Sequence, residues 1–270
     1  MMLSFSCFAK TYKVYVGTPP GSTSDLQARM IFDAVSKQTG DTFVILNRPG
    51  AGFVISYKAF LEDSKNNPDV ILFSISSMLL PDAKIDPVNE IKGLVLLHKI
   101  HYFLVALEDS KFKTVSDIKG KLNVSITSPT SEILVTKNFP NSGLQTIPFK
   151  SENDALMSLL KKEIDLSSSN NMNAGLSSHR DKLRVIKAYP DNFFGFVGYS
   201  VPMNFPEDDK IRLNSAINKA LETPEIRNWF KDIVGEYPSG GSPEQYDKMT
   251  RYVKKELETL HKNSVDTLNK

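Results

Sequence analysis

The sequence has a single cysteine, Cys7, and only four histidines among its 270 residues. One thiol cannot form an internal disulfide, and no two histidines have the spacing of a zinc-protease helix. We therefore expect neither a disulfide scaffold nor a metal site, and nothing implies a cofactor. The sequence also has no large excess of either charge, since it contains 33 basic and 31 acidic residues. A net charge of +2 predicts no nucleic-acid partner.

Long hydrophobic runs are absent as well. The longest candidate, residues 93–107, is interrupted by His98, Lys99 and His101, whereas a membrane span needs about 18 or more apolar residues. Residues 1–10 are apolar and close on small side chains, which resembles the last part of a secretory signal without its basic start. We expect this segment to be the remnant of a truncated signal peptide on an exported, soluble protein. The alternative is an edge strand or a disordered tag.

What the sequence does contain is a regular alternation of short apolar runs with helical stretches. This alternation is typical of βαβ units around a largely parallel sheet. Strands are expected at 12–17, 42–47, 69–77, 103–107, 121–127, 144–150, 183–190 and 193–200, and helices at 25–40, 53–63, 132–139 and 151–164, with further helices near the C-terminus. Because no flexible linker separates the two halves, we expect two α/β lobes joined by strands that cross between them.

The most informative segment is the turn TPPGSTS, residues 18–24, between the first strand and the first helix. The first turn of a helix leaves amide groups without partners and carries a partial positive charge, so it favours an anion where glycine and serine let the backbone approach. The alternative is that one hydroxyl caps the helix while Asp25 complements its dipole. The lysine of a nucleotide-binding P-loop is missing.

Other polar segments follow later strands. The glycine turn NRPGAGF at 47–53 fails as a dinucleotide fingerprint and is best interpreted as a tight turn. Hydroxyl-rich strand ends at 74–77 and 127–131 lie where a cleft would open in such a fold. The uncharged segment 167–173 is either an ordinary polar loop or a wall of the cleft. No nucleophile motif such as GxSxG is present.

Two of these motifs, VGTPPGSTSDLQAR and VILNRPGAGF, occur in the order and at the interval found in one family. Together they resemble the paired N-terminal signature of the substrate-binding proteins of tripartite tricarboxylate transporters, the Bug or TctC family. The similarity continues to the C-terminal part of the chain, through TVSDIKGKLNVSITSPTS, IPFKSENDALMSLLKKEIDL, HRDKLRVIKA and LNSAINKALETPEIRNWFKDIVGEYPSGGSPEQY. It covers the sequence from about Lys13 onward.

The resemblance implies a periplasmic-binding-protein-like fold of type II, with a ligand cleft between two α/β lobes. Residues 11–102 and 201–270 would form lobe 1, and residues 103–200 would form lobe 2. The residues implied in ligand binding are Thr18, Pro19, Pro20, Gly21, Ser22, Thr23, Ser24, Ser76, Ser77, Ser128, Thr130, Ser131, Ser169 and Asn170. Those that match the motif but are expected to shape turns are Asp25, Arg29, Asn47, Pro49, Gly50 and Gly52.

The chain departs from the family pattern at the expected cleft. The family's Tyr-Lys-Gly-Gly after one strand is here the segment 149–152, Phe-Lys-Ser-Glu, and two acidic positions of the family correspond to Ser169 and Asn170. We therefore expect the cleft to be less negative than in relatives that accept amino acids, and the ligand to be more anionic.

The function that the resemblance implies is reversible capture of a small carboxylate in the periplasm by a monomer, for the membrane permease subunits of a tripartite tricarboxylate transporter. Two alternatives stay open at this point. One is a sensory or scavenging binding protein of the same fold, and the other is an enzyme acting on small organic acids, for which neither an activated nucleophile nor a metal set is visible.

Overall fold

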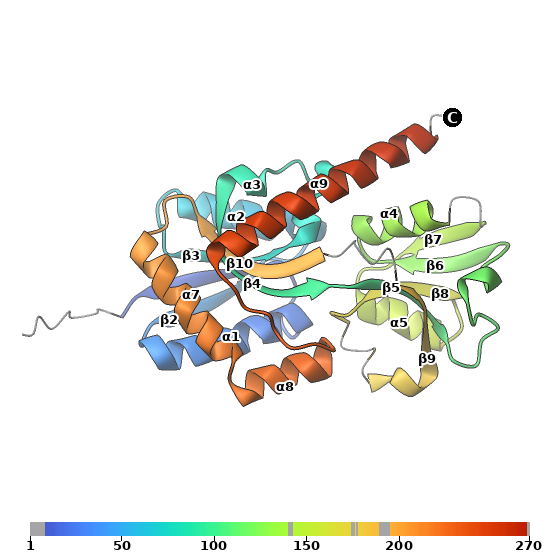
Figure 1. Ribbon diagram of the computed structural model, residues 1–270, viewed down its shortest axis with the longest axis horizontal. Coiled ribbons are helices and arrows are strands. Elements are labelled where there is room, and N and C mark those ends of the chain that lie inside the picture. Colours follow the sequence, from blue (N-terminus) through green and yellow to red (C-terminus); the bar gives the residue numbers. More distant parts are fainter. Residues whose placement is uncertain (1–8, 140–142, 174–175, 177, 189–194, 269–270) are drawn as a thin grey trace, which may run out of the picture.

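In a computed structural model, which describes residues 9–139, 143–173, 176, 178–188 and 195–268, two α/β lobes lie side by side (Figure 1). Each lobe is built on one five-stranded sheet. The proposed signal remnant lies almost entirely outside the described residues. No helix among the residues described is long and apolar enough to cross a membrane.

The sheet of the first lobe has the order β2-β1-β3-β10-β4. Its strands are β1 (Thr11–Val16), β2 (Thr42–Asn47), β3 (Val70–Ile75), β4 (Ile91–Ile100) and β10 (Gly195–Pro202). The first three are parallel, and β10 runs antiparallel between β3 and β4. Parallel strands bring their carboxyl ends to one edge of the sheet, which is where the turns at 18–24 and 76–77 begin.

The sheet of the second lobe has the order β7-β6-β8-β5-β9. Its strands are β5 (Tyr102–Leu107), β6 (Leu122–Ile126), β7 (Leu144–Pro148), β8 (Leu166–Asn170) and β9 (Leu183–Ala188). Here β7, β6 and β8 are parallel, while β5 pairs antiparallel with β8 and β9. In each sheet four strands therefore run in one direction, and a single strand, β10 in the first lobe and β5 in the second, runs in the opposite direction.

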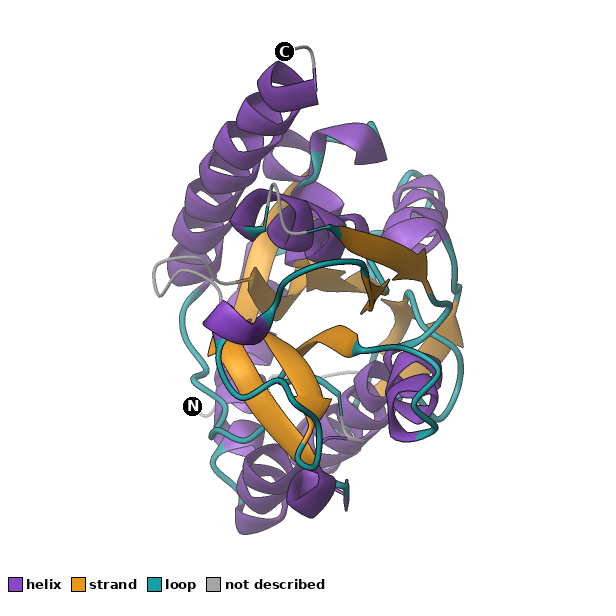
Figure 2. Ribbon diagram, turned by 90° about the vertical axis from the view of Figure 1, so that its right-hand side faces the viewer, coloured by secondary structure: helices purple, strands orange, loops and turns teal. Residues whose placement is uncertain are grey.

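Helices cover the sheets, and the longest runs along one side of the molecule to the C-terminal end (Figure 2). The helices are α1 (Thr23–Thr39), α2 (Val54–Ser64), α3 (Pro87–Glu90), α4 (Pro129–Asn138), α5 (Glu152–Leu160), α7 (Glu207–Leu221), α8 (Pro224–Ile233) and α9 (Pro243–Leu268). Short 3-10 turns lie at η1 (Ala51–Phe53), η2 (Ser76–Leu79), η3 (Pro81–Ala83), η4 (Val115–Asp117) and η5 (Arg180–Lys182). Gly40 ends α1 in the left-handed conformation, with φ of 78°, as the sequence predicts.

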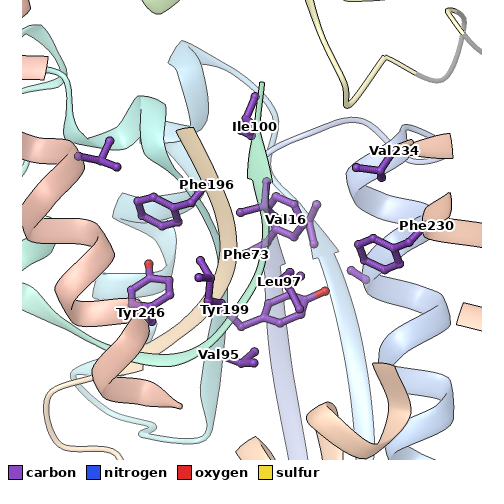
Figure 3. Close-up of a cluster of buried hydrophobic side chains, with 14 of the residues drawn as sticks. Val16, Phe73, Val95, Leu97, Ile100, Phe196, Tyr199, Phe230, Val234 and Tyr246 are labelled. Carbon is purple, nitrogen blue, oxygen red and sulfur yellow. The ribbon is translucent and has the colours of Figure 1, made fainter. Parts of the chain in front are cut away.

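Aromatic side chains pack against both faces of β10 in the first lobe (Figure 3). On one face Tyr199 makes edge contacts with Phe32 at 4.8 Å and Phe73 at 5.8 Å between ring centroids. On the other face Tyr246 of α9 packs against Phe196 at 5.3 Å. These rings anchor α1 and α9 to the sheet whose edge carries the predicted site.

The chain passes between the lobes where the apolar run 93–107 divides into two strands. Only His101 separates the end of β4 in one sheet from the start of β5 in the other. The strand β10 belongs to the first sheet, so residues 195–200 add a strand there, although the sequence division assigned them to lobe 2. The apolar pattern of that strand shows that it is buried but does not reveal its partners.

Only residues 171–173 of the polar segment 167–173 are a loop, because residues 167–170 form the end of β8. Its serines are buried, and Ser167 shares a hydrogen bond of 2.8 Å with Ser125 on the neighbouring strand β6. Hydroxyls that bond across a sheet lose little by burial, which is why a serine run can occupy a strand.

Candidate functional site

The turn that precedes α1 is closed by its own side chains. Ser22 is the N-cap, and its hydroxyl accepts a bond from the Asp25 amide at 3.4 Å and donates to Thr18 Oγ1 at 2.6 Å. The capping interpretation therefore holds for Ser22. Gly21 has φ of 80°, which favours glycine, and Pro19, Pro20 and Gly21 are exposed. Thr23 and Ser24 supply the first amides of the helix, and the ligand role of this turn stays a prediction.

Asp25 joins this turn to the end of β2. Its buried carboxylate accepts bonds from the Gly21 amide at 2.8 Å, Arg29 Nε at 3.0 Å and Asn47 Nδ2 at 2.9 Å. Asn47 Nδ2 also donates to the Thr18 carbonyl at 2.9 Å. Burial alone would raise the pKa of Asp25, but these donors outweigh it and lower the pKa. A charged Asp25 thus fixes the backbone of the turn.

The second glycine turn follows β2 with an irregular backbone. Gly50 and Gly52 have φ of 122° and 57°, and Phe53 itself is left-handed with φ of 75°. The Phe53 ring lies where a Cβ on Gly17 would be, at 2.3 Å. Pro49 is exposed beside the turn. The turn therefore inserts a ring against the end of β1.

In the second lobe, α4 begins at a comparable hydroxyl turn after β6. Ser128 is the N-cap, and Ser131 Oγ accepts from the amides of Thr127 and Ser128 at 3.1 Å each. Both hydroxyls are thereby committed to the turn. The buried Thr130 hydroxyl, which is 3% exposed, lies beside the phenol of Tyr102. Its role in binding a ligand stays a prediction.

The two lobes meet at the phenol of Tyr102, the first residue of β5. Its hydroxyl interacts with Ser76 of the first lobe and lies beside Thr130 of the second. Burial raises the pKa of Tyr102 to about 12, so the phenol is neutral near neutral pH. A Cβ on Gly195 would lie 2.3 Å from Ser76 Oγ and 3.0 Å from this phenol oxygen. Two residues predicted from opposite lobes thus converge on one point, while Ser77 is half-buried next to Ser76.

A carboxylate lies beside the carboxyl ends of β6 and β8 in the second sheet. Glu152, the first residue of α5, accepts bonds from Thr127 Oγ1 at 2.5 Å, Asn170 Nδ2 at 3.1 Å and Ser169 Oγ at 3.0 Å. Burial raises the pKa of Glu152, and the bonds from Thr127 and Ser169 oppose that rise. Its charge also acts on the nearby Tyr102. Glu152 therefore belongs to the region where the two lobes meet.

The expectation of a less negative cleft stays a prediction, because two acidic positions of the family are replaced here while Glu152 supplies one carboxylate in the same place. Ser169 and Asn170 do replace two acidic positions of the family, but both donate to the carboxylate of Glu152. In the sequence, Glu152 is visible only as the loss of a family glycine. The signal that could have revealed it is the exchange itself, because an acid appears at 152 where acids disappear at 169 and 170.

Tyr102 and Gly195 were also missed as site residues. Both lie in apolar runs that the sequence pattern assigns to strands. A linear pattern does not show that the Tyr102 hydroxyl lies beside Ser76, 26 residues earlier, and Thr130, 28 residues later. That information comes from the topology, which brings β5 and β10 to the crossing between lobes.

Two surface grooves lie apart from these residues. One is lined by Leu26, Met30 and Trp229 between α1 and α8, and the other lies beside His98 and Tyr237. Neither contains a predicted ligand-binding residue. Among the residues described, no three His, Cys, Asp or Glu side chains gather as a metal site would require.

Comparison with known proteins places the chain in a family. The model of the tripartite tricarboxylate transporter family receptor matches residues 27–192. The UPF0065 protein in the tcbD-tcbE intergenic region of Pseudomonas sp. (strain P51) is 23% identical, over 84% of this chain and 78% of the relative.

Two solved structures have the same fold. R. palustris Rpa4515 with adipate is 16% identical with a TM-score of 0.78, over 94% of this chain and 96% of that one. MatC (Rpa3494) from Rhodopseudomonas palustris with bound malate is 19% identical with a TM-score of 0.76, over 93% and 98%. These likenesses confirm the two-lobed fold of periplasmic binding proteins. Because the family model matches more than half of the sequence, the chain belongs to the tripartite tricarboxylate transporter receptor family.

Proposed function

We propose that this protein is an extracytoplasmic solute receptor that captures a small organic carboxylate between its lobes and delivers it to a tripartite tricarboxylate-type transporter. The observation that carries the proposal is the convergence of Ser76 and Thr130, from opposite lobes, on the phenol of Tyr102. A ligand held there contacts both lobes. The adipate and malate bound to the two structural neighbours support a carboxylate as the ligand.

The donors at this site suit a carboxylate. Thr130 Oγ1 is buried beside the phenol of Tyr102, and α1 and α4 both begin at the hydroxyl turns. Helix N-termini favour anions because their first amides lack partners within the helix. Micromolar affinity needs about 8 kcal/mol, and each hydrogen bond to a charged group contributes about 1.5 to 3 kcal/mol. A few such donors suffice after the cost of ordering the ligand.

Binding is reversible and is coupled to closure of the lobes. A ligand that contacts both lobes binds the closed state more tightly than the open state, and only this difference shifts the population. The crossing at His101, between β4 and β5, is where the lobes would rotate. In this account the receptor acts as a monomer in the periplasm, and the permease subunits of the transporter recognise the closed form.

A thermal-shift screen of the purified protein tests this proposal. The panel contains mono-, di- and tricarboxylates, amino acids, aromatic acids, neutral amides of the same acids, and sugars. Binding to the native state alone stabilises it by about 2.7 kcal/mol at a hundredfold excess over the dissociation constant. We expect at least one small carboxylate to raise the melting temperature while its neutral amide does not. The absence of a shift with every carboxylate, in a cooperatively folded sample free of retained ligand, would contradict the proposal.

A further inference from the structure

We propose that Glu152 selects the ligand, so that this receptor takes a carboxylate whose other end carries an ammonium group rather than a second carboxylate. The inference rests on the proposed function and names the substrate class of the same site. It follows from what the carboxylate of Glu152 does to the second lobe's wall of the cleft.

Glu152 first removes the donors that a second ligand carboxylate would need. The side chains of Thr127, Ser169 and Asn170, at the carboxyl ends of β6 and β8, all donate to its two oxygens. Asn170 Oδ1 in turn accepts from the Met172 amide at 2.8 Å, which fixes the orientation of the Asn170 amide group. These three donors are therefore already bonded to a carboxylate of the protein itself.

The carboxylate keeps room for one more donor. Two carboxylate oxygens offer about four acceptor positions. Oε1 of Glu152 receives the bonds from Thr127 and Asn170, whereas Oε2 receives only the bond from Ser169. An open acceptor position therefore remains on Oε2, and the side chain of Glu152 is half-buried rather than fully removed from solvent. A ligand group that donates a hydrogen bond fits this position, and a carboxylate does not.

The charge of Glu152 decides between ammonium and hydroxyl donors. The three side chains that donate to Glu152 are neutral, and no ion pair joins it to a described Lys, Arg or His side chain. A carboxylate withdrawn from water without a counter-charge is costly, and a cation placed against it removes much of that cost. An ammonium group supplies both the hydrogen and the charge. The hydroxyls near Ser76 and Thr130 then remain for the ligand's own carboxylate.

The test is a calorimetric titration at pH 7.5 with matched carboxylates. Each series has two, three or four methylene groups and ends in an ammonium group, a hydroxyl group or a second carboxylate. The proteins are the wild type, the charge-removing variant Glu152→Gln and the control Glu132→Gln. Glu132 is an exposed carboxylate in the first turn of α4, in the same lobe.

We expect the wild type and Glu132→Gln to prefer the ammonium member over its diacid by tenfold or more, the range that one hydrogen bond to a charged group produces. Glu152→Gln should lose that preference while it retains a cooperative melting transition. A wild-type preference for the diacid or the hydroxyl member would overturn the inference without touching the proposed function. An ammonium preference that survives in Glu152→Gln would overturn it too. Absence of binding by every carboxylate would overturn both.

Discussion

His98 is a buried histidine on β4. We expect it to lower the free energy of unfolding as the pH falls, and a substitution that does not titrate should remove this effect. The side chain is 1% exposed and packs edge-on against Phe230, with ring centroids 5.5 Å apart. Its Nδ1 lies 2.9 Å from the Lys99 carbonyl. Burial lowers the pKa of His98 from 6.5 to about 4, so the folded protein keeps the ring neutral.

The magnitude follows from the difference between folded and unfolded pKa values. Since the folded pKa lies below the unfolded one, the unfolded chain takes up the proton first as the pH falls. The stability present above about pH 6.5 is therefore lost progressively toward pH 4. Down to pH 5 this covers about 1.5 pH units at about 1.36 kcal/mol each, so the loss attributable to His98 is about 2 kcal/mol.

The assay is urea denaturation at pH 7.5 and pH 5.0 for three proteins. His98→Asn retains an amide that can donate to the Lys99 carbonyl but does not titrate. His101→Asn is the matched control, because it removes a histidine whose side chain is half-exposed and not buried. Its Nε2 lies 3.5 Å from Glu236 Oε2. We expect the wild type and His101→Asn to lose about 2 kcal/mol more than His98→Asn over this interval. Equal losses in the wild type and His98→Asn would refute the reasoning.

Three further changes test the site. Gly195→Ala places a Cβ 2.3 Å from Ser76 Oγ, so we expect overpacking to destabilise the protein by about 1 to 3 kcal/mol in urea denaturation; an unchanged midpoint would show that the crossing is loosely packed. Asp25→Ala leaves the Gly21 amide and Arg29 without their acceptor, and we expect a loss of about 3 kcal/mol by the same measurement, whereas an exposed control such as Asp33→Ala should lose less than about 0.5 kcal/mol. Because burial raises the pKa of Glu152, the folded state binds its proton first as the pH falls. The free energy of unfolding of the wild type should therefore rise relative to that of Glu152→Gln as the pH is lowered below neutral. A relative fall with acid would contradict the raised pKa.

Much of the fold could be predicted because local signals and topology agree. Ser22 and Gly40 mark the two ends of α1 through capping and left-handed geometry, and Ser151 caps α5 by accepting from the Asp154 amide at 3.1 Å. Such caps act within a few residues, so a linear sequence contains them. The apolar strands were equally visible, since burial on both faces leaves a continuous hydrophobic run.

What escaped prediction depends on contacts between distant segments. Ser167 of β8 looks like a loop residue until Ser125 on β6 provides its partner. Glu152 looks like a surface acid at a helix start until Ser169 and Asn170 are brought beside it. In both cases a polar side chain is buried because a partner 17 to 42 residues away satisfies it. Propensity and periodicity carry no information about such pairs.

The central claim is that one carboxylate is held between the lobes beside Ser76 and Thr130, and a titration of two isosteric or near-isosteric variants tests it most directly. Thr130→Val and Ser76→Ala each remove one hydroxyl, from opposite lobes, with little change in shape. With the carboxylate that gives the largest thermal shift, the account predicts that each variant binds at least about tenfold more weakly than the wild type, since each loses a hydrogen bond to a charged group. Unchanged affinity in both variants would place the ligand elsewhere, for example in the groove beside His98 and Tyr237, and would contradict the account.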